Sequence, residues 1–212
     1  TPLHVVGVSL GGSALLNWLG RAGAGAGSIV ARAAAVSAPL DLMAAGRSID
    51  RGSNRLYAWH FLRTLAPKAR AIASRFPGRL DASRLSRLTT MWAFDDAVTA
   101  PLHGFGGTDD YWTRASSKPW LARIGVPTLV LNARNDPFIP AASLARATEV
   151  SPQVVLEQPE HGGHAGFATG PFPGRLDWLP RRLLAWFDNA SRDDDGRGAP
   201  SDHAHVGPGT AA

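Results

Sequence analysis

Five residues near the start of the chain, Gly7-Val8-Ser9-Leu10-Gly11, restrict its fold more than any other segment. The valine-rich stretch Leu3–Val8 predicts a buried strand, and Gly11–Leu19 carries leucines at helical spacing. A strand that turns sharply at a serine into a helix leaves the serine hydroxyl exposed at the edge of a sheet. The pattern alone occurs by chance in glycine-rich chains, so it is the flanking strand and helix that indicate a nucleophilic position for Ser9.

Strands and helices alternate along the rest of the chain. Short apolar runs predict further strands at Ala31–Ser37, Val126–Asn132 and Val154–Glu157. Between about residues 47 and 117 the strand signals stop, and we expect a helical cap insertion. The expected helices are Leu42–Ala45, Tyr57–Leu65, Leu85–Val98, Ala141–Thr148 and Leu176–Phe187, with breaks at Pro67, Pro77 and Pro101. The predicted fold class is therefore α/β, a mostly parallel sheet with helices on both faces.

The size and composition of the chain fit one folded domain. With 212 residues, of which 44% are apolar, the chain can bury a sizeable core. We expect this domain to span residues 1–189, with the insertion at 47–117 as part of it. Beyond Asn189 the sequence turns polar, acidic and rich in glycine, so residues 190–212 are expected to be disordered.

An acid and a base for Ser9 follow two of the later strands. A serine hydroxyl needs a base to accept its proton, and that base needs an orienting acid. Where a serine stands at such a strand-to-helix turn, the acid and then the histidine come later in the chain, on loops after strands. Asp136 lies four residues after the strand Val126–Asn132, and His164 follows Val154–Glu157. The sequence thus predicts a catalytic triad of Ser9, His164 and Asp136.

Several residues compete for these roles. Asp41 also follows a strand, although capping of the helix that begins at Leu42 accounts for it. His161 lies three residues before His164 and is better explained as a turn or supporting residue. His103 is a candidate for lining an acyl pocket. Aromatic residues of the insertion are further candidates for that pocket, with plain core as the alternative: Trp59, Phe61, Trp92, Phe105, Tyr111 and Trp112.

Charge and composition limit the partners. The net charge is +5, and Arg63–Arg87 holds seven cations against the single acid Asp81. Such a run is typical of a solvated helical face, with attraction to an anionic membrane surface or an acidic substrate as the alternative. No nucleic-acid-binding module accompanies it, so a nucleic-acid partner is not expected. Neither a metal nor a cofactor is expected, because the triad itself supplies base, nucleophile and orienting charge.

Two further features bear on compartment. The chain has no cysteine, which fits a reducing compartment, so we expect a cytoplasmic protein. It also has no run of about 18 apolar residues of the kind that spans a membrane. The sequence does not indicate an oligomeric state.

Segments beyond the triad resemble one known family. GVSLGGSALLNWLG at residues 7–20, FDDAVTAPLHGF at 94–105 and EHGGHAGF at 160–167 resemble the YheT-like α/β-hydrolases, as do SAPLDL at 37–42, DDYWTRAS at 109–116 and VPTLVLNARNDPFIP at 126–140. The resemblance implies an esterase or acyltransferase acting on carboxylic esters of short or medium acyl chains, with the triad on Ser9, Asp136 and His164. It implies no triad role for Asp95 and Asp96, which we interpret as helix-capping or structural residues.

The start of the chain departs from the family pattern. The backbone N–H of Leu10 is expected to donate to the oxyanion of the tetrahedral intermediate, and a second donor normally comes from a loop upstream of the turn. We expect that the early strands and this loop are missing by N-terminal truncation. Loss of one such donor typically lowers the rate by about 10² to 10³, so the chain alone is expected to be a weak catalyst. The competing hypotheses are acyl transfer to an alcohol and an inactive fragment or binding module of the same fold.

Overall fold

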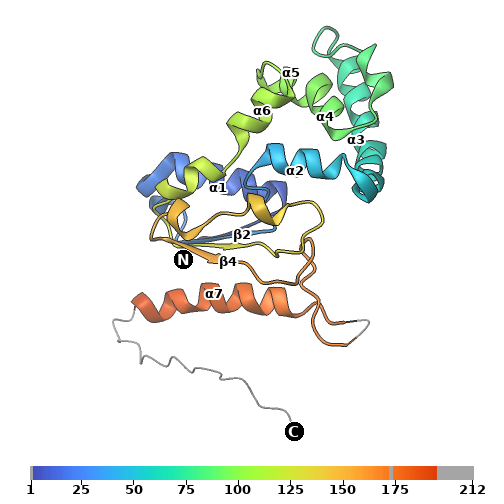
Figure 1. The fold of residues 1–212 in the computed structure, drawn as a ribbon. Helices are drawn as coiled ribbons and strands as arrows, with labels where there is room; N and C mark the ends of the chain where they lie inside the picture. Colours follow the sequence, from blue (N-terminus) through green and yellow to red (C-terminus); the bar gives the residue numbers. More distant parts are fainter. Residues whose placement is uncertain (1, 172–173, 195–212) are drawn as a thin grey trace.

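A four-stranded parallel sheet forms the centre of the molecule (Figure 1). The computed structural model describes residues 2–171 and 174–194. The strands are β1 (His4–Val8), β2 (Arg32–Val36), β3 (Thr128–Leu131) and β4 (Val154–Glu157), and they lie side by side in that order. All four expected strands are present; β4 has the expected bounds and the other three are slightly shorter, and the predicted α/β fold with a parallel sheet is confirmed.

The register brings the carboxyl ends of the strands to one edge of the sheet. Val8 pairs with Val36, Val36 with Leu131, and Leu131 with Glu157. Because the strands are parallel, the loops that follow them all leave from this edge. The turn at Ser9 and the loops carrying Asp136 and His164 therefore start from one side of the sheet.

Helices cover both faces of the sheet (Figure 1). Helix α1 (Leu10–Ala22) lies on one face, where Leu16 and Leu19 pack with β2 residues Ala33 and Ala35. Helix α7 (Trp178–Asp194) lies on the other, where a second cluster joins Trp186 to Ala34, Val36, Leu129 and Leu131. Strands buried on both faces are apolar throughout rather than alternating, which explains the uninterrupted run Ala33–Val36.

The segment between β2 and β3 is largely helical and projects away from the sheet on the α1 side (Figure 1). Its helices are α2 (Leu42–Ile49), α3 (Arg55–Arg75), α4 (Met91–Phe94), α5 (Ala100–His103) and α6 (Thr108–Ala115). A π-helical turn, Asp95–Thr99, joins α4 to α5. A separate apolar cluster holds α3 against this turn and includes Leu62, Leu85, Phe94 and Val98.

Short 3₁₀ turns complete the path of the chain. They are Gly23–Ser28, Gly52–Asn54, Arg84–Arg87, Lys118–Arg123, Ala141–Ser143 and Ala147–Glu149. In the part of the chain that the structure describes, no helix is both long enough and apolar enough to cross a bilayer.

Several predicted helix boundaries are wrong. Helix α3 continues through Pro67, where the proline sits on the exposed side of the helix and the unpaired carbonyl one turn earlier can meet water. The expected helix at Leu85–Val98 begins only at Met91, because Thr90 caps it by accepting a hydrogen bond from the Ala93 N–H at 3.0 Å. It then runs past Pro101 to His103.

The segment 141–148 and the end of the chain also differ from expectation. Residues 141–148 form two short 3₁₀ turns rather than a helix, because the backbone is extended at Leu144 between them. The Ser143 hydroxyl donates to the Pro140 carbonyl at 2.7 Å and closes the first turn. Helix α7 reaches Asp194 and so ends beyond residue 189, where the domain was expected to end; residues 195–212 of the expected tail lie outside the described residues.

Candidate active site

Ser9 occupies a strained turn between β1 and α1. Its backbone angles are φ 52° and ψ −128°, in a region that residues other than glycine rarely adopt. The turn is held from both sides, since the Ser9 N–H donates to the Val36 carbonyl at 2.8 Å and the Ser9 carbonyl accepts from the Gly12 N–H at 2.9 Å. These bonds fix the serine at the carboxyl end of β1, at the N-terminus of α1.

Two glycines let the strand and helix approach each other at this turn. A Cβ atom at Gly7 would lie 2.6 Å from the Gly11 carbonyl oxygen, and one at Gly12 would lie 2.9 Å from the Cβ of Ala38. A Cβ at Gly11 would meet no described atom within 4 Å. The space that the turn requires is therefore at Gly7 and Gly12, and not at Gly11 as the five-residue pattern implies.

The structure brings Ser9, His164 and Asp136 together in one chain of hydrogen bonds. His164 Nε2 lies 3.0 Å from Ser9 Oγ, and His164 Nδ1 lies 2.8 Å from Asp136 Oδ2. The Asp136 side chain is fully buried and that of His164 is 20% exposed. The other carboxylate oxygen of Asp136 accepts from the backbone N–H groups of Phe138 at 2.8 Å and Ile139 at 3.3 Å. A buried carboxylate fixed in this way holds the imidazole with Nδ1–H toward the acid and Nε2 free to accept the serine proton.

Two polar residues that sequence reasoning missed hold the histidine loop in place. Asn135 Oδ1 accepts from the backbone N–H groups of Gly162 and Gly163, both at 2.9 Å. Ser37, which has a φ of 49° at the end of β2, accepts from the Ala165 N–H at 3.1 Å through its hydroxyl. The available signal was position, because Asn135 directly precedes Asp136 and Ser37 directly follows a strand.

Ser9 and His164 open into an apolar cavity of about 350 Å³. The ring of Phe138 packs against His164 with its centroid 4.8 Å away, and so covers one side of the imidazole. The apolar lining comes mainly from the helices between β2 and β3: Leu42, Ala45, Ile49, Phe61, Leu65, Met91, Phe94 and Trp112, together with Pro39, Leu10 and Ile139. Of the six aromatic residues that the sequence offered for an acyl pocket, Phe61, Tyr111 and Trp112 line this cavity and Trp59, Trp92 and Phe105 do not.

A carboxyl group, Asp95, interrupts this apolar lining. Its oxygens accept from the Thr99 hydroxyl at 2.6 Å and from the Trp112 indole N–H at 2.8 Å. Burial raises the pKa of Asp95 above its ordinary value, and burial likewise raises the pKa of Tyr111, to which the negative charge of Asp95 adds. Asp95 is thus a wall residue of the cavity as well as a structural residue of the π-helical turn.

The residues that competed with Asp136 and His164 in the sequence have other places in the structure. Asp41 caps α2, accepting from the Ala44 N–H at 3.0 Å, as expected. His161 is exposed, and His103 is exposed at the end of α5 and does not line the cavity. Leu10 is the first residue of α1, where backbone N–H groups have no partner within the helix.

Comparisons with known proteins identify the family. A family model described as the alpha/beta hydrolase fold matches residues 1–171. The chain belongs to the α/β-hydrolase family. The resemblance to YheT-like α/β-hydrolases is also confirmed, because the chain is 34% identical over 187 residues to the Escherichia coli protein named "Putative esterase YheT", covering 87% of the chain and 54% of that protein.

Two mammalian proteins are similar to the chain as well. It is 32% identical over 182 residues to phospholipase ABHD3 of Mus musculus, covering 85% of the chain and 44% of the relative. It is 29% identical over 202 residues to monoacylglycerol lipase ABHD2 of Bos taurus, covering 88% and 48%. The chain therefore spans about half the length of the curated relatives that it matches.

Proposed function

We propose that this α/β-hydrolase chain carries the catalytic centre of a serine hydrolase that cleaves carboxylic esters. The observation that supports the proposal most is the continuous path of hydrogen bonds from Ser9 Oγ through both nitrogens of His164 to the buried Asp136. The three similar proteins described above are named as an esterase, a phospholipase and a monoacylglycerol lipase, all terms for enzymes that cleave esters.

Acylation begins at the Ser9 hydroxyl. His164 Nε2 accepts the hydroxyl proton while Ser9 Oγ forms a bond to the ester carbonyl carbon, and the carbonyl oxygen becomes an oxyanion. The N–H of Leu10, at the N-terminus of α1, donates to this oxyanion, and the helix dipole favours the negative charge. His164 then gives its proton to the leaving alcohol oxygen as the C–O bond breaks, and an acyl-enzyme remains on Ser9.

Deacylation repeats these steps with water. His164 accepts a proton from water as the water oxygen attacks the acyl carbon, and the acid is released with Ser9 reprotonated. The negative charge of Asp136 stabilises the imidazolium that forms at each proton transfer. No step requires a metal or a cofactor.

The cavity supports acyl esters of short to medium chain as substrates. A volume of about 350 Å³ lies at the lower end of the range for small-molecule sites, and its lining is mostly aliphatic and aromatic. We propose that the segment at residues 47–117 acts as a cap on the domain at residues 1–189, because Phe61, Leu65 and Met91 from this segment form much of the cavity wall. A chain-length series of nitrophenyl esters measures the preferred acyl group.

A fluorophosphonate probe tests the proposal. The probe is expected to label the chain covalently at one site, and Ser9→Ala is expected to abolish labelling and ester hydrolysis. Ser28→Ala is a matched control, because Ser28 is exposed in the turn after α1 and, among the described residues, its hydroxyl bonds only to the Gly25 carbonyl, at 2.8 Å. Equal labelling of Ser9→Ala and the unmodified chain would refute the assignment. Added ethanol distinguishes acyl transfer, which yields an ethyl ester, from hydrolysis, which yields only free acid.

A further inference from the structure

Helix α3 carries positive charge without compensation along its length. Its 21 residues, RLYAWHFLRTLAPKARAIASR, include four arginines and one lysine but neither aspartate nor glutamate. One face of the helix is buried through Ala58, Leu62, Ala66 and Ala69. The cations therefore lie on the remaining surface of the helix, which faces solvent.

Large apolar side chains are exposed among these cations. Leu56 is 68% exposed and Trp59 is 53% exposed. They form part of a groove of about 790 Å³ along α3, whose apolar walls are completed by Leu62, Ala66, Pro67 and Leu88 and which also includes Arg55, Arg63 and Arg70. Apolar surface gathered in a groove and bordered by charge marks interaction sites more often than scattered apolar residues do.

The three arginines of the groove have no acidic partner among the described residues. The guanidinium of Arg63 lies over the ring of Trp59, 4.8 Å from its centroid, and Arg70 donates to the Leu85 carbonyl at 3.5 Å. By contrast, Arg84, on the neighbouring 3₁₀ turn, pairs with Asp96. The charge of the groove is thus available to an external anion.

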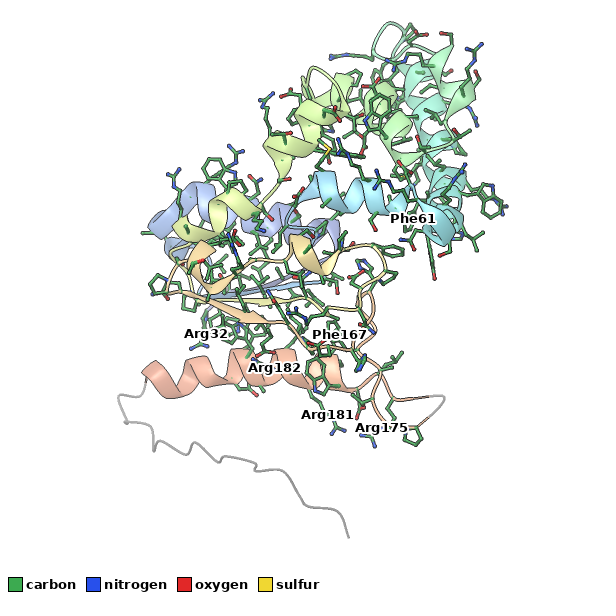
Figure 2. The ribbon with its side chains drawn as sticks, viewed as in Figure 1. Arg32, Phe61, Phe167, Arg175, Arg181 and Arg182 are labelled. Atoms are coloured by element: carbon green, nitrogen blue, oxygen red, sulfur yellow. The ribbon has the colours of Figure 1, made fainter. Side chains whose placement is uncertain are left out.

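The other side of α3 belongs to the catalytic cavity. Phe61 and Leu65 line that cavity, and Tyr57 packs edge-on against Phe138, the ring that covers His164. Figure 2 shows Phe61 at the end of α3 nearest the sheet, while Arg175 and Arg181 lie at the opposite side of the molecule near α7. Helix α3 therefore stands between the basic groove and the cavity that contains Ser9.

We propose that the groove along α3 docks on the surface of an anionic lipid membrane. Guanidinium groups bind phosphate oxygens in pairs, and a tryptophan and a leucine among them match the boundary between lipid headgroups and acyl chains. Charge complementarity favours this partner, because a neutral protein surface would leave Arg55, Arg63 and Arg70 desolvated and unpaired. Docking would place the outer side of α3 against the lipid, and the inner side of the same helix forms one wall of the cavity at Ser9.

Vesicle binding tests the proposal. We expect the chain to float with vesicles of phosphatidylcholine and phosphatidylglycerol at 50 mM salt, and to bind far less to phosphatidylcholine alone or at 500 mM salt. Each cation near an anionic bilayer strengthens binding about fivefold, so Arg63→Gln combined with Arg70→Gln is expected to weaken it about 25-fold. Arg175→Gln combined with Arg181→Gln removes the same charge far from the groove and is expected to change binding less than threefold.

Lipid depth gives a second measurement that does not depend on charge. Brominated acyl chains quench tryptophans that enter the bilayer, and we expect the quenching to fall in Trp59→Phe while flotation persists. Failure of the chain to bind anionic vesicles at low salt would overturn the proposal. So would an equal loss of vesicle binding in the double variant at Arg63 and Arg70 and in the double variant at Arg175 and Arg181. A dimer that Trp59→Ser dissociates, without vesicle binding, would identify a second copy of the chain as the occupant instead. Binding requires no reaction at Ser9, so these outcomes are independent of the proposed esterase activity.

Discussion

Replacement of Asp136 by asparagine changes the site in a way that its hydrogen bonds determine. One carboxylate oxygen accepts from the N–H groups of Phe138 and Ile139, so in the variant this position must keep the amide oxygen. The amide NH₂ then takes the place of the oxygen that lies 2.8 Å from His164 Nδ1. An NH₂ group cannot accept from Nδ1–H, and the imidazole changes to the tautomer with its proton on Nε2.

The altered tautomer removes the base. Nε2–H would face Ser9 Oγ, 3.0 Å away, as a donor and could not accept the serine proton. The corresponding change in a well-studied serine protease lowers kcat about 10⁴-fold, and we expect a similar loss in the rate at which the fluorophosphonate probe labels Ser9. A loss of 10⁴ corresponds to about 5.5 kcal/mol of lost transition-state stabilisation.

Asp41→Asn is the matched control for this experiment. Asp41 also follows a strand, but it caps α2, and asparagine caps helices as well as aspartate does. Its labelling rate is expected to stay within about twofold of the unmodified chain. Thermal unfolding checks that both variants fold. The reasoning is refuted if Asp136→Asn folds and loses less than tenfold, or if Asp41→Asn loses as much as Asp136→Asn.

Four further substitutions test the site and its surroundings. Gly7→Ala is expected to lower the free energy of unfolding in urea by about 2 kcal/mol or more, because the added Cβ meets backbone atoms at 2.6 Å. Gly11→Ala, with open space around its Cβ, should leave that free energy unchanged or slightly raised, and equal losses would contradict the packing argument. Asn135→Ala removes the acceptor for two N–H groups of the histidine loop, so it is expected to slow labelling of Ser9 about tenfold. Its unfolding midpoint is expected to stay close to that of the unmodified chain. Because burial raises the pKa of Asp95, its contribution to stability is present at acid pH and is lost as pH rises through that pKa. The quantity to measure is the free energy of unfolding of the unmodified chain minus that of Asp95→Asn. This difference should fall from pH 4 to pH 7, and a rise would contradict the argument.

Local sequence signals were sufficient for the sheet and for the proposed triad. Each strand is a short, mostly apolar run, and such a run is recognisable without knowing its neighbours; the central strands β2 and β3 are buried on both faces. Because the strands are parallel, residues just after each of them must meet at one edge. Ser9, Asp136 and His164 therefore come together from positions up to 155 residues apart.

Features that depend on distant contacts could not be predicted. The need for glycine at Gly12 arises in part from Ala38, which is far along the chain, so no local pattern indicates it. The continuation of α3 through Pro67 depends on the buried face of that helix packing into its own apolar cluster, which outweighs the cost of the proline. Asp95 was expected to be only structural, because nothing in the local sequence shows that the π-helical turn directs it to the cavity.

The separation of the apolar clusters on the sheet from the cluster in the helical segment has a consequence for specificity. Ser9, Asp136 and His164 are fixed by backbone bonds at strand ends, whereas much of the cavity wall comes from helices that share a third apolar cluster of their own. Side chains such as Phe61 and Leu65 can therefore change in size without moving the hydrogen bonds of the proposed triad. Substrate preference, and contact with a lipid surface on the far side of α3, can then vary while the chemistry at Ser9 stays constant, because the two depend on different sets of packing contacts.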